Sequence, residues 1–310
     1  MPSASEIRQQ LESEARRRGR LATPAFAGGF LYLLSAIMIS GTLKGAPTVG
    51  LVQGLEPALR GEANPAVSPR TEEVKFISRH AFALISGSTI AALAIGGLTL
   101  ILLLLFDATR FRRPTIWSMA RPLVLFGGLA VALVSIAHQV ISAIETHKFA
   151  VGHNFTNHAV EQAITQSSGN QAVEYLALLS GLALAAGMIV VMINALRVGL
   201  LPRWMAILGM FTALLILLPL GGAELQVVPA LWMVMMGVLV FGRWPGGDPP
   251  AWPSGEARPW PSQASMRAGR RGGAGNDSSG QNGRGDVVPA PVIPAARSSR
   301  KRRKRGAVEQ

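Results

Sequence analysis

Six long apolar segments, separated by polar stretches, constrain the fold of this chain more than any other feature. They lie at about 25–43, 79–106, 121–144, 173–197, 203–221 and 225–242. A helix rises 1.5 Å per residue, so about 20 residues cross a hydrocarbon layer of about 30 Å. Within such a layer a helix satisfies all of its own backbone hydrogen bonds. The sequence therefore predicts an all-α, polytopic transmembrane bundle of six helices over residues 25–243.

The first and second helices each have a polar lead. Residues 1–24 are basic, and their apolar positions recur at four-residue spacing, which predicts a separate amphipathic helix ahead of the first transmembrane helix. This spacing is carried by Ile7, Leu11 and Ala15. Ser68 and Pro69 suit an N-cap and a first helical position, so the second helix is expected to begin at 69 or at 79.

Residues 244–310 differ in composition from everything before them. They are rich in Pro, Gly, Ser and Arg and poor in apolar residues. A segment of this kind cannot bury enough apolar surface to offset the entropy lost on ordering. We therefore predict a disordered basic tail that ends in the run from Arg300 to Arg305.

The distribution of basic residues predicts the orientation. With the N-terminus in the cytoplasm, 24 of the 30 Lys and Arg residues fall on the cytoplasmic side of a six-helix protein. We therefore expect both termini to be cytoplasmic and the location to be the cell membrane. The net charge of +13 then indicates contact with the anionic inner leaflet; a protein partner stays open, and nucleic acid is not expected. The basic residues expected to contact lipid are Arg16, Arg17, Arg18, Arg112, Arg113, Lys301, Arg302 and Arg303.

Histidines gather near the predicted outer face. Imidazole and carboxylate groups are ligands for zinc, copper, iron or haem, so a metal or haem site is one interpretation. In the predicted outer loop at 145–172, His147 and His153 are six residues apart and His153 and His158 are five residues apart. Neither spacing places two ligands on one helical face. The other interpretation is therefore a polar surface loop, and no cofactor is required. The candidate metal ligands are His138, His147, His153, His158 and Glu145.

Polar residues inside predicted transmembrane helices are the best indicators of function in a membrane protein. Here the candidates for buried polar residues are His138, Gln139 and Asn194, which could line a ligand or proton path or form hydrogen bonds between helices. The chain has no cysteine, no Walker A loop, no Gly-x-Ser-x-Gly elbow, no His-Glu-x-x-His and no dinucleotide fingerprint. An enzyme is therefore the least favoured class.

A set of small, aromatic and basic residues recurs around the last two apolar segments. It consists of Gly199–Leu200–Leu201–Pro202–Arg203–Trp204, Leu208–Gly209, Leu231–Trp232, Gly237 and Arg243, and the continuation from Trp244 to Trp252. This stretch of about 60 residues resembles an uncharacterised family of bacterial, actinobacterial-like, six-helix membrane proteins. The resemblance implies a bacterial inner-membrane location and a six-helix fold, but no activity.

Two hypotheses of function follow. The first is a non-enzymatic membrane protein with a structural, regulatory or partner-binding role. The second is a protein that binds or transports a small ligand, metal or haem through the outer histidines and glutamates.

Overall fold

The computed structural model describes residues 4–50, 59, 67–152, 154–217, 223–245 and 247–260, and every regular element within them is helical. The chain divides into a unit over residues 1–260 and a second unit over 261–310. The second unit, which holds most of the predicted tail, lies outside the described residues.

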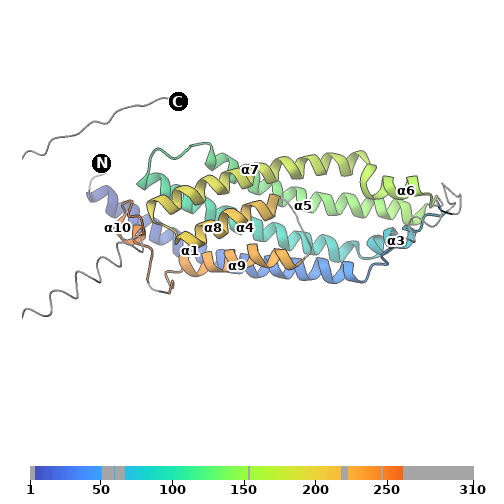
Figure 1. Ribbon diagram of the computed structural model, residues 1–310, viewed down its shortest axis with the longest axis horizontal. Helices are drawn as coiled ribbons and strands as arrows, with labels where there is room; N and C mark the ends of the chain where they lie inside the picture. The colour runs from blue at the N-terminus through green and yellow to red at the C-terminus, as the bar shows by residue number, and fades with distance from the viewer. Residues whose placement is uncertain are drawn as a thin grey trace, which may run out of the picture. The chain divides into compact units, whose positions relative to one another are not determined.

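Four long helices run side by side through the first unit (Figure 1). They are α1 (Ala4–Lys44), α4 (Ala81–Arg112), α5 (Ala120–Val151) and α7 (Ser168–Val198). Each contains a stretch long and apolar enough to cross a membrane. With 31 to 41 residues, they measure roughly 46 to 62 Å and exceed a hydrocarbon layer of about 30 Å.

Two shorter apolar helices, α8 (Arg203–Leu217) and α9 (Ala223–Val240), complete the bundle. At 15 and 18 residues they are roughly 22 and 27 Å long. They lie along the part of the bundle that also holds the start of α1, with α9 beside α1 (Figure 1). We call this end of the bundle the α10 end, after the short helix α10 (Ala251–Ser254) found there.

Small residues permit the close packing of these helices. A Cβ atom added to Gly127 of α5 would lie 2.6 Å from the backbone nitrogen of Leu184 in α7. The buried Trp232 of α9 crosses to α8, where its indole N–H donates a 2.9 Å hydrogen bond to the carbonyl of Met205.

The opposite end of the bundle carries a small cap. Helix α3 (Thr71–Arg79) is separated from α4 by a break at His80, and α6 (Asn157–Glu161) continues into the π-helical turn η1 (Gln162–Gln166). Val74, Phe149, Val160 and Ala163 form its core. Part of the stretch 145–172, predicted as a loop, is therefore helical.

Two predicted boundaries are wrong. The segment 1–24 is not a separate helix, because α1 passes through Pro24 without interruption from Ala4 to Lys44. The tail does not begin at 244, because residues 247–260 pack onto the bundle and Ala251 and Trp252 are buried.

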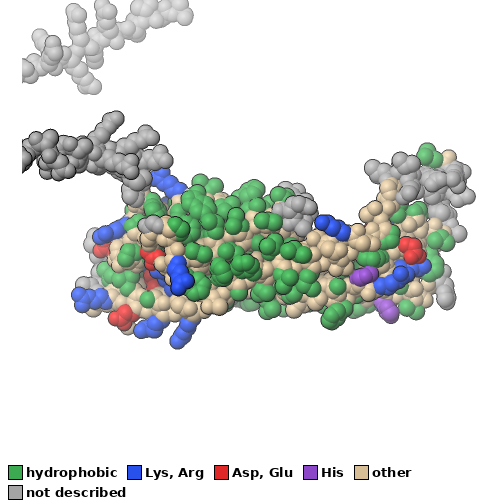
Figure 2. Space-filling view, turned by 90° about the horizontal axis from the view of Figure 1, so that it is seen from below, with side chains coloured by type: hydrophobic (Ala, Val, Ile, Leu, Met, Phe, Trp, Pro, Cys, Tyr) green, Lys and Arg blue, Asp and Glu red, His purple; other side chains and the backbone are tan. Residues whose placement is uncertain are grey.

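The charged side chains lie mainly towards the two ends of the bundle. Figure 2 shows hydrophobic side chains over the middle of the visible face, with Lys, Arg, Asp and Glu towards both ends. This is the surface distribution of a bundle whose middle is surrounded by lipid.

Candidate functional site

A buried ion pair joins α1 to α4 at the α10 end. Both guanidinium nitrogens Nη1 and Nη2 of Arg112 bind the Glu14 carboxylate, at 2.8 and 2.9 Å. The side chains of Arg112 and Glu14 are only 0% and 5% exposed. A two-point pair of this geometry is among the stronger charge-assisted interactions, and burial shields it from water.

Arg112 also holds the segment that follows α9. Its Nε–H donates to the carbonyl of Ala251 at 3.1 Å, and its guanidinium lies 5.7 Å from the centre of the Trp252 ring. A second cation, Arg18 of α1, lies 4.4 Å from the same ring. The indole is therefore in contact with two guanidinium groups, each of which favours its electron-rich face.

Arg18 binds the end of α9 as well as the segment after it. Its Nη2 and Nε donate to the carbonyls of Leu239 and Val240 in the last turn of α9, where the Leu239 carbonyl also accepts from the Gly242 N–H at 3.0 Å. Its Nη1 binds the Asp248 carboxylate at 3.0 Å. One arginine of α1 thus caps a helix and anchors the chain that follows it.

The docked segment 247–260 makes further contacts with the α7–α8 connection. The indole N–H of Trp252 donates to the carbonyl of Leu200 at 3.1 Å, and the amide of Arg258 donates to the carbonyl of Val198 at 3.0 Å. Gly199 between these carbonyls has φ +83°, and a Cβ atom there would collide with the Arg258 carbonyl. Only glycine fits this turn without strain.

The amphipathic pattern of α1 places two of its charged residues, Glu14 and Arg18, on the face that packs against the rest of the bundle. Gly255, at the end of α10, lies against Ile7 and Leu11. The same helical face continues through Glu14 and Arg18 to the fully buried Ala22. Sequence reasoning missed Glu14 and Trp252. Extending the apolar stripe beyond Leu11 would have placed Glu14 on the inward face.

A second, more exposed ion-pair group lies beside the buried pair. Asp107 of α4 accepts from Arg17 at 3.0 Å and lies 3.5 Å from Arg121 of α5. Its side chain is 31% exposed, and those of the two arginines are 60% and 55% exposed. Exposed pairs of this kind contribute little to stability but set the charge of the surface.

These contacts bear on the prediction that eight basic residues contact lipid. Arg112 and Arg18 were predicted to contact lipid. This is wrong for Arg112, whose side chain is fully buried, and Arg18 is largely buried against α9 and Trp252. Arg16 and Arg17 are exposed and Arg113 is half-buried, so they keep that prediction. Lys301, Arg302 and Arg303 lie outside the described residues.

The candidate metal ligands do not form a cluster where they are described. Within the described residues, no group of three His, Asp or Glu side chains could hold a metal ion. His138, His147 and His158 are exposed, and Glu145 pairs with Lys148 at 3.0 Å. His153 lies outside the described residues, so the metal or haem hypothesis stays a prediction.

The three intrahelical polar residues also lie apart from one another. His138 is exposed, so the expectation that it is buried is wrong; only a small part of α5 is covered by other helices. Gln139 is half-buried. Asn194 donates from its amide to the carbonyl of Val190, one turn earlier in its own helix, at 2.8 Å. These contacts do not connect the three residues into a path.

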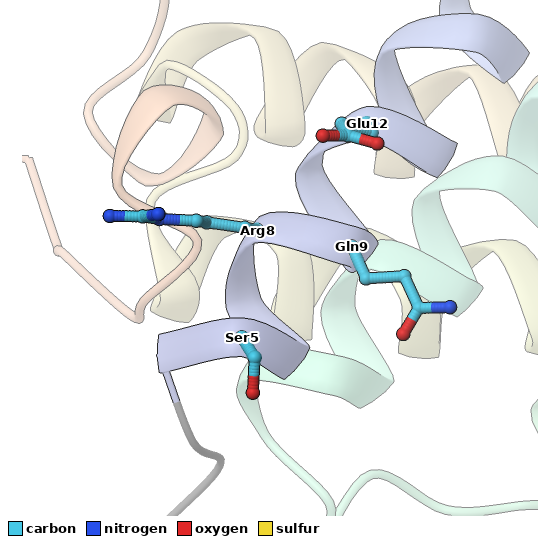
Figure 3. A pocket seen from close by; sticks show the side chains of 4 residues that line it. All are labelled: Ser5, Arg8, Gln9 and Glu12. Atoms are coloured by element: carbon cyan, nitrogen blue, oxygen red, sulfur yellow. The ribbon is translucent and has the colours of Figure 1, made fainter.

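A hollow of about 420 Å³ lies along the first turns of α1. Figure 3 shows that Ser5, Arg8, Gln9 and Glu12 point in different directions around it. All four come from one helix, so they do not converge on a common point. We therefore base no chemistry on this hollow.

Comparisons with known proteins identify no relative of this chain. The scan against family models and the searches of curated proteins and of solved structures found no match.

Proposed function

We propose that this chain is a six-span protein of the bacterial cell membrane, with both termini in the cytoplasm, and that its role is structural or regulatory rather than catalytic. In this role the α10 end lies at the inner face, where anionic lipid and a protein partner bind. The excess of basic residues on that side and the four long apolar helices support the proposal.

The α8–α9 hairpin supplies the fifth and sixth spans in this proposal. Its helices of roughly 22 and 27 Å approach the thickness of the hydrocarbon layer. The four long helices exceed that thickness, so their α3 and α6 ends would project outside the membrane.

The docking of residues 247–260 is the observation that carries the proposed role. The segment is held by Arg18, Arg112 and Leu200, and the chain continues from Trp260 towards the basic run at 300–305. A linker held at its base leaves the bundle at a fixed point and raises the effective concentration of its far end near that surface. We infer that the bundle presents the basic region to the inner leaflet and to a partner protein.

Single cysteines test the topology, because the chain has none of its own. Cysteines at Gly61, Thr115, Gly169 and Gly280 would be treated in intact cells with a maleimide that does not cross membranes. We expect labelling at Gly61 and Gly169, and labelling at Thr115 and Gly280 only after the cells are opened. The reverse pattern overturns the proposed orientation.

A photo-crosslinker at Ser298 tests the role of the tail. In living cells it should give a discrete adduct with a protein or with phospholipid. Trp252→Ala should reduce that adduct, while Trp117→Ala, which removes an exposed indole, should leave it unchanged. If Trp252→Ala has no effect, the docked segment does not present the tail; if the parent chain gives no adduct, the proposed role is wrong.

A further inference from the structure

A groove of about 300 Å³ lies between α1 and α4 beside the buried Glu14–Arg112 pair. Arg17 contributes to it from α1, and Asp107 and Arg110 from α4. The half-buried Phe111 supplies apolar surface in the same groove, and Leu104, which also lines it, is only 3% exposed. The groove therefore combines two guanidinium groups with an apolar wall.

The groove has an excess of positive charge. Glu14 is neutralised by Arg112, and Asp107 is shared between Arg17 and Arg121. Arg110 is exposed, and within the described part of the chain no carboxylate lies within ion-pair distance of it. Its guanidinium lies 6.0 Å from the centre of the Phe106 ring. Asp107 is the one carboxylate shared by Arg17 and Arg121, and Arg110 adds a third positive charge, so two positive charges remain for a ligand.

The groove lies where the outer face of α4 changes from apolar to charged. Along this face, exposed Leu100 and half-buried Leu103 are followed by Asp107 and Arg110, within roughly 15 Å of helix. In a membrane-spanning chain this change marks the boundary between acyl chains and headgroups. A ligand here would therefore meet hydrocarbon on one side and guanidinium groups on the other.

We propose that this groove binds the phosphodiester of an anionic membrane phospholipid. Arg17 and Arg110 donate hydrogen bonds to its phosphate oxygens, which the forked guanidinium geometry suits. The first acyl carbons lie against Leu100 and Leu103, on the adjoining apolar face of α4. This site deepens the proposed function, since it rests on the chain being in a membrane, but it does not depend on the role of the tail.

Native mass spectrometry of the detergent-solubilised full chain, titrated with phosphatidylglycerol, tests the proposal. Arg17→Gln combined with Arg110→Gln should weaken retention of one lipid by about tenfold or more, because two charge-assisted hydrogen bonds are lost. The matched control is Arg79→Gln, which removes an exposed arginine at the opposite end of the bundle and should have no effect. Circular dichroism checks that each variant is folded.

Asp107→Asn should have the opposite effect on lipid retention, because it removes the carboxylate that competes with the phosphate group for Arg17. This variant should retain phosphatidylglycerol more tightly than the parent chain. Equal retention by the parent and the double variant overturns the proposal, as does displacement of the lipid by millimolar inorganic phosphate. Lipid retention in detergent does not depend on how the chain is oriented in the membrane. The lipid test can therefore fail while the cysteine labelling supports the proposed orientation, and the labelling can fail while the lipid test succeeds.

Discussion

Removing the carboxylate of Glu14 should strongly destabilise the bundle. In Glu14→Ala the Arg112 guanidinium keeps its bonds to the carbonyls of Ala108 and Ala251 but loses its counter-ion, at a position where its side chain is fully buried. Breaking a buried pair in this way costs about 3–5 kcal/mol, because a charge stays buried without compensation. At roughly 2–4 °C per kcal/mol for a chain of this size class, the melting temperature should fall by roughly 6–20 °C.

Thermal unfolding in detergent, followed by near-ultraviolet circular dichroism, would measure this change. The control is Glu73→Gln, whose partner Arg70 is 46% exposed at the other end of the bundle. An exposed pair contributes at most about 1 kcal/mol, so this control should shift the melting temperature by no more than about 4 °C. If Glu14→Ala behaves like the control, the reasoning from burial is refuted.

The double variant Glu14→Leu, Arg112→Met tests whether Glu14→Ala is unstable because it leaves the Arg112 charge buried without a counter-ion. With both charges removed, no uncompensated ion remains in the interior, and apolar replacements of buried pairs are often close to neutral. It should therefore be more stable than Glu14→Ala, although it loses the bond to the Ala251 carbonyl. A double variant less stable than the single one would contradict this explanation.

Three other predictions concern separate parts of the molecule. Trp252→Phe removes the hydrogen bond to Leu200 and should speed hydrogen–deuterium exchange at the amides of residues 251–258 while changing the melting temperature little. Gly127→Val should destabilise the α5–α7 contact, where a Cβ atom meets backbone at 2.6 Å, whereas Gly96→Ala, with open space around it, should leave the melting temperature unchanged or slightly raised. Metal analysis and an optical spectrum of the purified protein test the metal or haem hypothesis, under which stoichiometric metal or a Soret band should be present and should be lost on His153→Ala; their absence from the parent chain would count against it.

The helical regions were predictable because long apolar runs in a membrane setting have few alternatives to a helix. Their ends were less predictable, since the end of an apolar run is not the end of a helix. Helix α5 continues beyond Ile144 to Val151, and the i,i+3 pair of Glu145 and Lys148 lies on this polar extension. Helix α1 likewise includes the basic segment, because nothing between Arg20 and Pro24 ends it.

The ion-paired cluster was not predictable from local pattern. Glu14 and Arg112 are 98 residues apart, and Arg18 and Asp248 are 230 apart. Their pairing depends on how the helices are arranged, which hydrophobic periodicity does not specify. Residues 247–260 were assigned to the tail by composition, but the buried Trp252 with its satisfied indole N–H and the bonds from Arg18 and Arg112 hold this short Pro- and Gly-rich segment in place.

The docking of Trp252 between Arg18 and Arg112 also sets an order of events during synthesis. The two arginines are made long before the indole that covers them, because a chain emerges from its N-terminus and its domains fold as they become complete. Until residue 252 has left the ribosome, this end of the bundle carries two guanidinium groups without their aromatic partner. A chain released before that residue therefore lacks the indole that covers Arg18 and lies against the Glu14–Arg112 pair.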